Sequence, residues 1–299
     1  MTGVWRSRLE RALPLLVIWP PAGLCALHVV GFTLWTTWIS FTSATLLPDD
    51  RWVGLRNYTS VLATRNWSIA FDNLLIFSSC FVLLTAAIGL LLAVLLDQRI
   101  RGENLLRTIF LYPMAVSFVV TGTVWGWLLN PRLGIEKLVV DLGWTGFRFD
   151  WLVDRDMAIF TVVIAAAWQA SGFAMALFLA GIRSVDGDLL KAAQIDGAGA
   201  WRIYRRIVLP TIAPIFVAVL IILLQFAIKT FDLVRALTGG GPGIATQLPT
   251  LVVYDFMFQR GLLARGSAAA VLMLLTLLGV LLPYFAYTRW RERKAARLG

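Results

Sequence analysis

The charged side chains that could do chemistry within an apolar part of this chain are gathered in one stretch, from Lys229 to Arg235. Lys229, Asp232 and Arg235 follow one another at i, i+3 spacing, so on a helix the carboxylate could pair with either cation. Charged groups at membrane depth are costly, and they are expected to pair and to face inward. The pattern suggests either a charge relay or a polar lining for the path of a solute.

The chain offers little for catalysis or metal binding. His28 is the one histidine, and Cys25 and Cys80 lie in apolar runs, where they are interpreted as small core residues. A P-loop needs a lysine directly after a glycine to hold phosphates, and none of the four lysines follows a glycine. We therefore expect no catalytic residue, no metal site and no cofactor in this chain.

The segments that must position these residues are strongly hydrophobic. Hydrophobic residues make up 59% of the 299 residues and charged residues 15%, with a mean hydropathy of +0.77. Soluble domains carry about 25% charged residues, and a helix needs about 20 apolar residues to cross a bilayer. We expect one all-α transmembrane domain over residues 1–299, a polytopic bundle with helices near 13–41, 73–96, 108–131, 157–182, 207–228 and 266–288.

The basic residues predict the orientation of this bundle. With the N-terminus inside, 16 of the 27 basic residues fall in the cytoplasmic segments, together with 7 of the 17 acidic ones; these segments are 1–11, 97–107, 183–206 and 289–297. Cytoplasmic loops are typically rich in arginine and lysine, so both termini are predicted to be cytoplasmic. The net charge of +10 then reflects topology and anionic membrane lipid, and no nucleic-acid partner is expected.

The stretch Leu189–Pro214 organises the predicted cytoplasmic side. Asp186 and Asp188 precede it, where carboxylates favour the start of a helix. Small residues from Gly197 to Ala200 then separate two short helical patterns, the second of which carries arginines on one side. An ordinary basic loop between two spans is the simpler interpretation of this composition.

The spacing of Ala192-Ala193, Asp196-Gly197-Ala198 and Leu209-Pro210 resembles the EAA motif of binding-protein-dependent ABC importer permeases. In that family the segment forms coupling helices that dock on a cytoplasmic ATPase. The resemblance implies an ATPase-coupling role for Lys191, Ala192, Ala193, Asp196, Gly197, Ala198, Leu209 and Pro210. Lys191 stands where the family has the Glu that names the motif, so the docking role is carried over and that residue's contact is not.

Two other segments carry the same resemblance. Val53–Tyr58 (VGLRNY) is similar to the GLxNY segment before the second helix of sugar permeases, and Thr238–Pro242 (TGGGP) resembles the TxGGP segment of the maltose-type permeases. The chain is identified as similar to the MalF/UgpA-type sugar permeases over nearly its whole length. The wording of Phe231–Gly243 looks closest to the α-glucoside and glucose/mannose branch.

The family resemblance implies an assembly. It comprises a second homologous permease subunit, two ATPase subunits that bind ATP and Mg, and an extracytoplasmic sugar-binding protein, in a bacterial or archaeal cytoplasmic membrane. The implied fold is the ABC type I importer permease, and the implied mechanism is alternating access. Positions resembling the sugar-contacting ones of maltose permease fall at Gln169, Ala170, Phe173, Ala227, Thr230 and Asp232. Gln169 also has a plainer interpretation, a hydrogen bond between helices.

Two other classes of protein remain as alternatives. An ion-coupled secondary transporter could use Lys229, Asp232 and Arg235 as a charge relay, and it would show inverted internal repeats, none of which is obvious here. A membrane-embedded enzyme would need clustered catalytic groups, which one histidine, two separated cysteines and scattered acids do not supply.

Overall fold

The computed structural model describes residues 3–47, 49–98 and 100–295, and in that part of the chain every regular element is a helix. One isolated antiparallel bridge joins Thr42 to Trp52. The predicted all-α class is therefore confirmed. Arg99 and the end of the predicted cytoplasmic tail, residues 296–299, lie outside the described residues. The chain forms two compact units, residues 1–63 with 253–275, and residues 64–252 with 276–299.

The first unit holds α1 (Gly3–Ser40), α2 (Arg56–Leu62), η2 (Asp255–Gln259) and the first part of α14 (Leu263–Ala295). Two buried residues of α2, Asn57 and Tyr58, form hydrogen bonds with the chain at the end of α1. The Asn57 amide donates to the carbonyl oxygens of Ser40 and Thr42, both at 2.8 Å, and the Tyr58 hydroxyl lies 2.6 Å from the Ser40 hydroxyl. The last carbonyls of a helix have no partner within it, so the Val53–Tyr58 segment closes α1.

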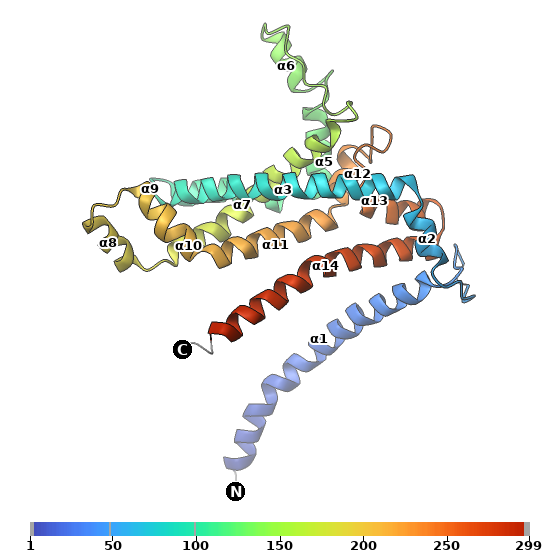
Figure 1. Ribbon diagram of the computed structural model, residues 1–299, viewed down its shortest axis with the longest axis horizontal. Helices are drawn as coiled ribbons and strands as arrows, with labels where there is room; N and C mark the ends of the chain where they lie inside the picture. Colours follow the sequence, from blue (N-terminus) through green and yellow to red (C-terminus); the bar gives the residue numbers. More distant parts are fainter. Residues whose placement is uncertain (1–2, 48, 99, 296–299) are drawn as a thin grey trace. The chain divides into compact units, whose positions relative to one another are not determined.

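The second unit is built on three long helices, α3 (Arg65–Asp97), α7 (Ala158–Arg183) and α11 (Ala213–Lys229), which lie side by side (Figure 1). Small residues allow α3 and α7 to approach closely. A Cβ atom added to Gly89 would lie 2.6 Å from the Cβ of Ala174 and 2.9 Å from the amide nitrogen of Met175. Close backbone approach at small residues is how helices pack in membranes, where apolar lipid supplies no hydrophobic driving force.

Two of the predicted spans are broken. The window 108–131 contains α4 (Glu103–Ala115) and α5 (Phe118–Leu128), which meet at 98°. The window 207–228 begins in a segment, Ala200–Thr211, that meets α11 at 68°. Each window contains a bend because Val116 is extended, at φ −78° and ψ 138°, and because Pro210 and Pro214 interrupt the backbone donors at the second bend.

Among the described residues, four helices are long and apolar enough to cross a membrane, and six if each bent pair counts as one span. The four are Val17–Ser40 in α1, α3, α7 and Leu263–Ala286 in α14. The predicted number of six spans therefore depends on the two bent pairs. In Figure 1 the short helix α8 (Gly187–Ile195) lies at one end of the second unit, and the short helix α6 (Ile135–Asp141) projects above α5.

The glycine-rich loop after α12 (Asp232–Leu237) is held by threonine hydroxyls. Gly239, Gly240 and Gly243 take positive φ values of 63°, 97° and 65°, a region that favours glycine. Thr238 and Thr246 share a hydroxyl hydrogen bond of 2.6 Å across the loop. The loop then leads into α13 (Pro249–Tyr254), so its Thr-Gly-Gly-Gly-Pro residues form a compact turn between two helices.

Candidate functional site

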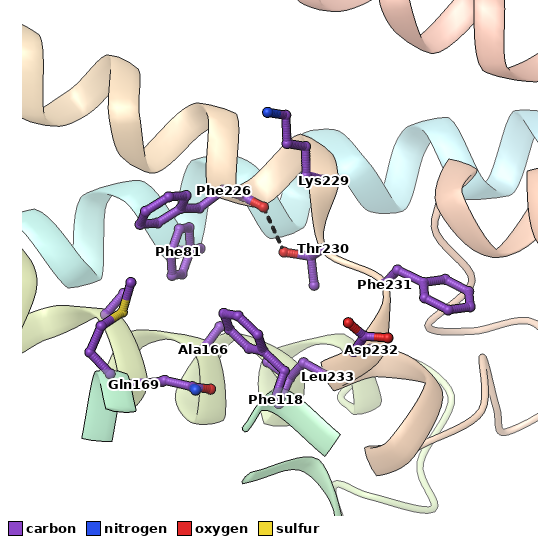
Figure 2. A pocket seen from close by; sticks show the side chains of 12 residues that line it. Phe81, Phe118, Ala166, Gln169, Phe226, Lys229, Thr230, Phe231, Asp232 and Leu233 are labelled. Atoms are coloured by element: carbon purple, nitrogen blue, oxygen red, sulfur yellow. Dashed lines mark hydrogen bonds between the residues drawn. The ribbon is translucent and has the colours of Figure 1, made fainter. Parts of the chain in front are cut away.

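A cavity of about 190 Å³ lies in the second unit, where α3, α4, α5, α7, α11 and α12 meet (Figure 2). Its wall combines aromatic rings with a few polar side chains. The lining includes Phe81, Phe118, Phe226 and Phe231 among the aromatic residues, and Gln169, Lys229, Thr230 and Asp232 among the polar ones. Apolar walls with a few placed polar groups are typical of sites for small molecules.

Gln169 is 1% exposed, and its two amide atoms have different surroundings. The Nε2 atom donates to the Val116 carbonyl oxygen at 2.7 Å, a contact that also fixes the orientation of the amide, because a carbonyl can only accept. The Oε1 atom is buried and has no hydrogen-bond partner among the described residues. Gln169 thus makes the hydrogen bond between helices, from α7 to the residue that ends α4, and it lines the cavity with its Oε1 atom unpaired.

The Gln169 contact also explains how a broken helix is stabilised in an apolar bundle. Val116 lies at the break between α4 and α5, where regular α-helical pairing of the backbone stops. An unpaired carbonyl in a membrane interior costs several kcal/mol. Gln169 satisfies the Val116 carbonyl from α7, so the break beside the cavity and the buried glutamine depend on each other.

Thr230 and Asp232 reach the cavity from the junction between α11 and α12. The Thr230 hydroxyl donates to the Phe226 carbonyl oxygen at 2.8 Å, which leaves its oxygen able to accept. Asp232 is exposed at the start of α12. In the part of the chain that the structure describes, Asp232 and Lys229 form no ion pair, and Figure 2 shows the Lys229 amino group pointing away from Asp232.

The suggested pairing of Lys229 with Asp232 is therefore wrong, and the backbone gives the reason. Thr230 is extended, at φ −60° and ψ 118°, and it ends α11 before Asp232 begins α12. Residues three apart share a face only on a continuous helix. The charges of this stretch are accordingly spread over a helix junction.

Four of the six residues named for the substrate pathway come together at the cavity: Gln169, Ala170, Thr230 and Asp232. The other two lie outside its lining. Phe173 packs its ring 5.6 Å from that of Phe226, and Ala227 is completely buried within α11. Contact with a substrate stays a prediction for all six.

Sequence reasoning missed Phe81, Met114, Phe118 and Phe226 as lining residues. A signal existed for two of them, since Pro113 stands inside the apolar window 108–131 and a proline disturbs a helix. A break near Pro113 would have directed attention to Met114 and Phe118. Phe81 and Phe226 have no distinguishing mark among the 18 phenylalanines of the chain.

The stretch with EAA-like spacing folds as two short helices around a tight turn, as its spacing predicts. These are α8 and α9 (Ala200–Ile203). The Asp186 carboxylate caps α8 by accepting from the Asp188 amide at 2.9 Å. Side-chain caps of this kind contribute about 1 kcal/mol to a helix. One π-helical turn, η1 (Tyr204–Val208), and α10 (Leu209–Thr211) then lead toward α11.

Gly197 ends α8 in a Schellman motif. Its φ is +76°, its amide bonds to the Gln194 carbonyl at 3.0 Å, and the Ala198 amide bonds to the Ala193 carbonyl at 3.0 Å. These are the two bonds that define the motif, and its positive φ favours glycine. The glycine of the EAA-like spacing therefore sets the turn between α8 and α9.

Two large apolar side chains of this segment are exposed. Ile195 is 86% exposed and Trp201 76% exposed. Lys191, Ala192, Asp196, Gly197 and Pro210 are exposed as well, while Ala193, Ala198 and Leu209 are half-buried. Lys191 pairs with Asp188 at 3.0 Å, but both side chains lie in solvent, at 74% and 88% exposure, where an ion pair contributes little. Large apolar side chains are therefore exposed beside polar ones on this segment.

Comparisons with known proteins find relatives that cover most of this chain. Residues 85–296 match the family model described as "Binding-protein-dependent transport system inner membrane component". The xylose/arabinose import permease XacH of Haloferax volcanii is 35% identical, with 89% of this chain and 85% of that protein covered. The trehalose/maltose transport system permease MalF of Thermococcus litoralis is 31% identical, with 95% and 96% covered.

The fold has a solved counterpart in a bacterial ABC transporter involved in the import of the acidic polysaccharide alginate. The TM-score is 0.81 at 20% identity, with 96% of this chain and 98% of that chain covered. The apolar helices, the α8–α9 segment and these matches lead to one conclusion. The chain belongs to the family of inner membrane components of binding-protein-dependent transport systems, and it is a multi-pass ABC importer permease.

Proposed function

We propose that residues 1–299 form one transmembrane domain that moves a sugar into the cytoplasm, with the cavity as part of the sugar's path. The observation that carries the proposal is the buried, unpartnered Oε1 of Gln169 at the cavity wall. Leaving a buried acceptor unsatisfied costs about 1 to 3 kcal/mol, and a sugar hydroxyl would remove that cost. The named substrates of the two relatives, xylose or arabinose and trehalose or maltose, are also sugars.

The remaining polar atoms suit a sugar as well. Asp232 carries a carboxylate that can accept two hydroxyl protons, and the Thr230 oxygen can accept another. Phe118 and Phe226 supply aromatic surface for the apolar face of a sugar ring. The cavity volume of about 190 Å³ lies below the usual range of about 300–1,000 Å³ for drug-sized ligands. The cavity volume is enough for one sugar unit. A second permease subunit would supply the opposite wall of the sugar's path.

The energy for transport comes from other subunits in this proposal. Two ATPase subunits, which hold ATP and Mg, dock on the exposed α8–α9 segment, and their closure drives alternating access. The exposed Ile195 and Trp201 support docking there. This chain is non-catalytic and binds no cofactor. An external sugar-binding protein delivers the sugar, and the assembly resides in the cytoplasmic membrane of a bacterium or archaeon.

The cavity is tested by removing one hydroxyl. Thr230→Val in the assembled transporter should raise the half-saturating sugar concentration about 3- to 10-fold, the loss of one hydrogen bond, for whichever of xylose, arabinose, maltose and trehalose is taken up. Thr108→Val is the matched control, because the Thr108 hydroxyl makes the same local bond, to the Asn104 carbonyl at 2.9 Å, at an exposed site on α4. Uptake that survives the combined change of Gln169, Thr230 and Asp232 to Ala would refute the cavity assignment.

The coupling proposal is tested by isolating the tagged chain from its own membrane. A P-loop ATPase should accompany it, and Ala193→Trp should abolish the association because Ala193 lies within the docking segment. The ion-coupled alternative predicts the opposite result: isolation of the chain alone, with uptake into vesicles that contain no ATP. That result would also restore interest in Lys229 and Asp232.

A further inference from the structure

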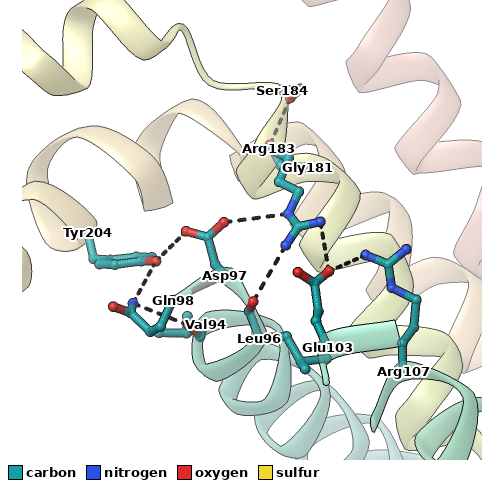
Figure 3. Close-up of polar contacts among 10 residues, drawn as sticks. All are labelled: Val94, Leu96, Asp97, Gln98, Glu103, Arg107, Gly181, Arg183, Ser184 and Tyr204. Carbon is teal, nitrogen blue, oxygen red and sulfur yellow. Dashed lines mark hydrogen bonds and ion pairs between the residues drawn. The ribbon is translucent and has the colours of Figure 1, made fainter. Parts of the chain in front are cut away.

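We call residues 187–208, from α8 to the end of η1, the coupling segment. The ends of three helices meet this segment in a network of polar side chains (Figure 3). Asp97 is the last residue of α3, Glu103 the first of α4 and Arg183 the last of α7, while Tyr204 begins η1 directly after α9. Arg183 Nη1 lies 2.9 Å from Glu103 Oε1, and Arg183 Nε lies 3.7 Å from Asp97 Oδ1. One arginine therefore connects the ends of all three helices.

Tyr204 adds the coupling segment to this network. Its hydroxyl donates to Asp97 Oδ2 at 2.6 Å and accepts from the Gln98 amide at 3.3 Å. Within the described chain, these two hydrogen bonds are the side-chain polar contacts from Gly187–Val208 to α3, to the Gln98 residue that follows it, and to α4 and α7. The acceptor is charged and its side chain is only 27% exposed, so the bond is stronger than a solvent-exposed neutral one.

The backbone at Tyr204 departs from a regular α-helix. The Leu209 amide bonds to the Tyr204 carbonyl, which closes a wide π-helical turn. Such turns are rare, and they are frequently found at functional sites. The Tyr204 ring is therefore held at the start of an irregular turn, between the docking surface on α8–α9 and the bend that leads into α11.

The helices that end in this network are the same helices that wall the cavity. At 1.5 Å per residue, Phe81 on α3 lies about 24 Å along the helix from Asp97, and Gln169 on α7 lies about 21 Å from Arg183. Helix α4 runs from Glu103 to Met114, which also lines the cavity. A displacement of Tyr204 would thus act on rigid elements that reach the cavity.

We propose that Tyr204 is a positioning residue that transmits the movement of the coupling segment, through Asp97 and Arg183, to the helices around the cavity. This inference rests on the proposed docking of ATPases at α8–α9. In this proposal the neutral hydroxyl of Tyr204 connects the docking of the ATPases to the change of cavity shape. Docking itself uses the exposed residues of α8 and α9, so it does not depend on the Tyr204 hydroxyl.

The experiment measures cavity shape directly and needs no knowledge of the sugar. Spin labels are placed beside the cavity at Val119→Cys and Gln225→Cys, with Cys25 and Cys80 changed to Ala. The label–label distance is recorded in the full complex with its ATPases, without nucleotide and after trapping with Mg-ATP and vanadate. In Tyr204→Phe the ATPases should still co-purify. The ratio of shifted to unshifted molecules, judged by the label–label distance, should fall about tenfold.

Two controls make the result specific. Tyr112→Phe removes a hydroxyl from a residue on α4 that is 68% exposed, and it should keep the full shift. Asp97→Ala combined with Tyr204→Phe should be no worse than the more severe single change, because each single change already removes the hydrogen bond between the two residues. A full shift in Tyr204→Phe, or additive losses in the double variant, would overturn the inference. No shift even with Tyr204 intact would instead refute the proposed alternating access.

Discussion

The turn between α8 and α9 makes a sharp prediction for Gly197→Ala. Gly197 adopts a φ of +76°, and a Cβ atom added there would have no heavy atom within 4 Å. The substitution therefore causes no clash, and its cost is that of a left-handed conformation for an L-residue, about 1 to 2 kcal/mol. That cost corresponds to about a 5- to 30-fold loss in the population of the native turn relative to other conformations.

Hydrogen exchange at this turn is the direct assay. The amides of Gly197 and Ala198 are bonded to carbonyls of α8, so their protection should fall by that factor in Gly197→Ala. The apparent affinity for the ATPase should weaken by up to the same factor, since only the native turn presents α8 and α9 together.

Two matched variants identify the cause. Gly197→Asn should lose less, because asparagine tolerates the left-handed region better than other residues with a side chain. Gly199→Ala should lose almost nothing, because Gly199 is extended at φ −69° and ψ 160° and has no heavy atom within 4 Å of an added Cβ. Equal protection in Gly197→Ala and Gly199→Ala would show that backbone strain at Gly197 does not hold the turn.

Two further predictions concern stability in detergent. Gly172→Ala should destabilise the protein by about 3 kcal/mol or more, because the added Cβ would collide with the backbone carbonyl of Phe110; Gly279→Ala, where the added atom meets nothing, should leave the melting temperature nearly unchanged. Asn57→Ala should cost about 2 to 4 kcal/mol, because two carbonyls at the end of α1 lose their donor. Thr59→Ala, at an exposed position of the same helix, is its control, and similar melting temperatures for the two variants would contradict the capping role of Asn57.

The hydrophobic windows of the sequence were enough to predict the class of fold and most of the long helices. A charge-free run of about 20 residues has few ways to satisfy its backbone in lipid other than a helix, so α3 and α7 appear where composition places them. The local turns could be predicted equally well from the sequence. The Asp186 cap and the Gly197 turn of α8 follow from residue types and spacing alone, because their bonds join residues at most five apart in the chain.

Tertiary structure decided what composition could not. The break at Val116 is stable because Gln169, 53 positions away in sequence, donates to the carbonyl that the helix leaves unpaired, and no local pattern indicates a partner at that distance. The same holds for the contact of Tyr204 with Asp97, 107 positions apart. The cavity and the polar network both arise where helices from distant parts of the chain meet. Which of the polar residues share a site therefore depended on packing, whereas the residues themselves were visible in the sequence.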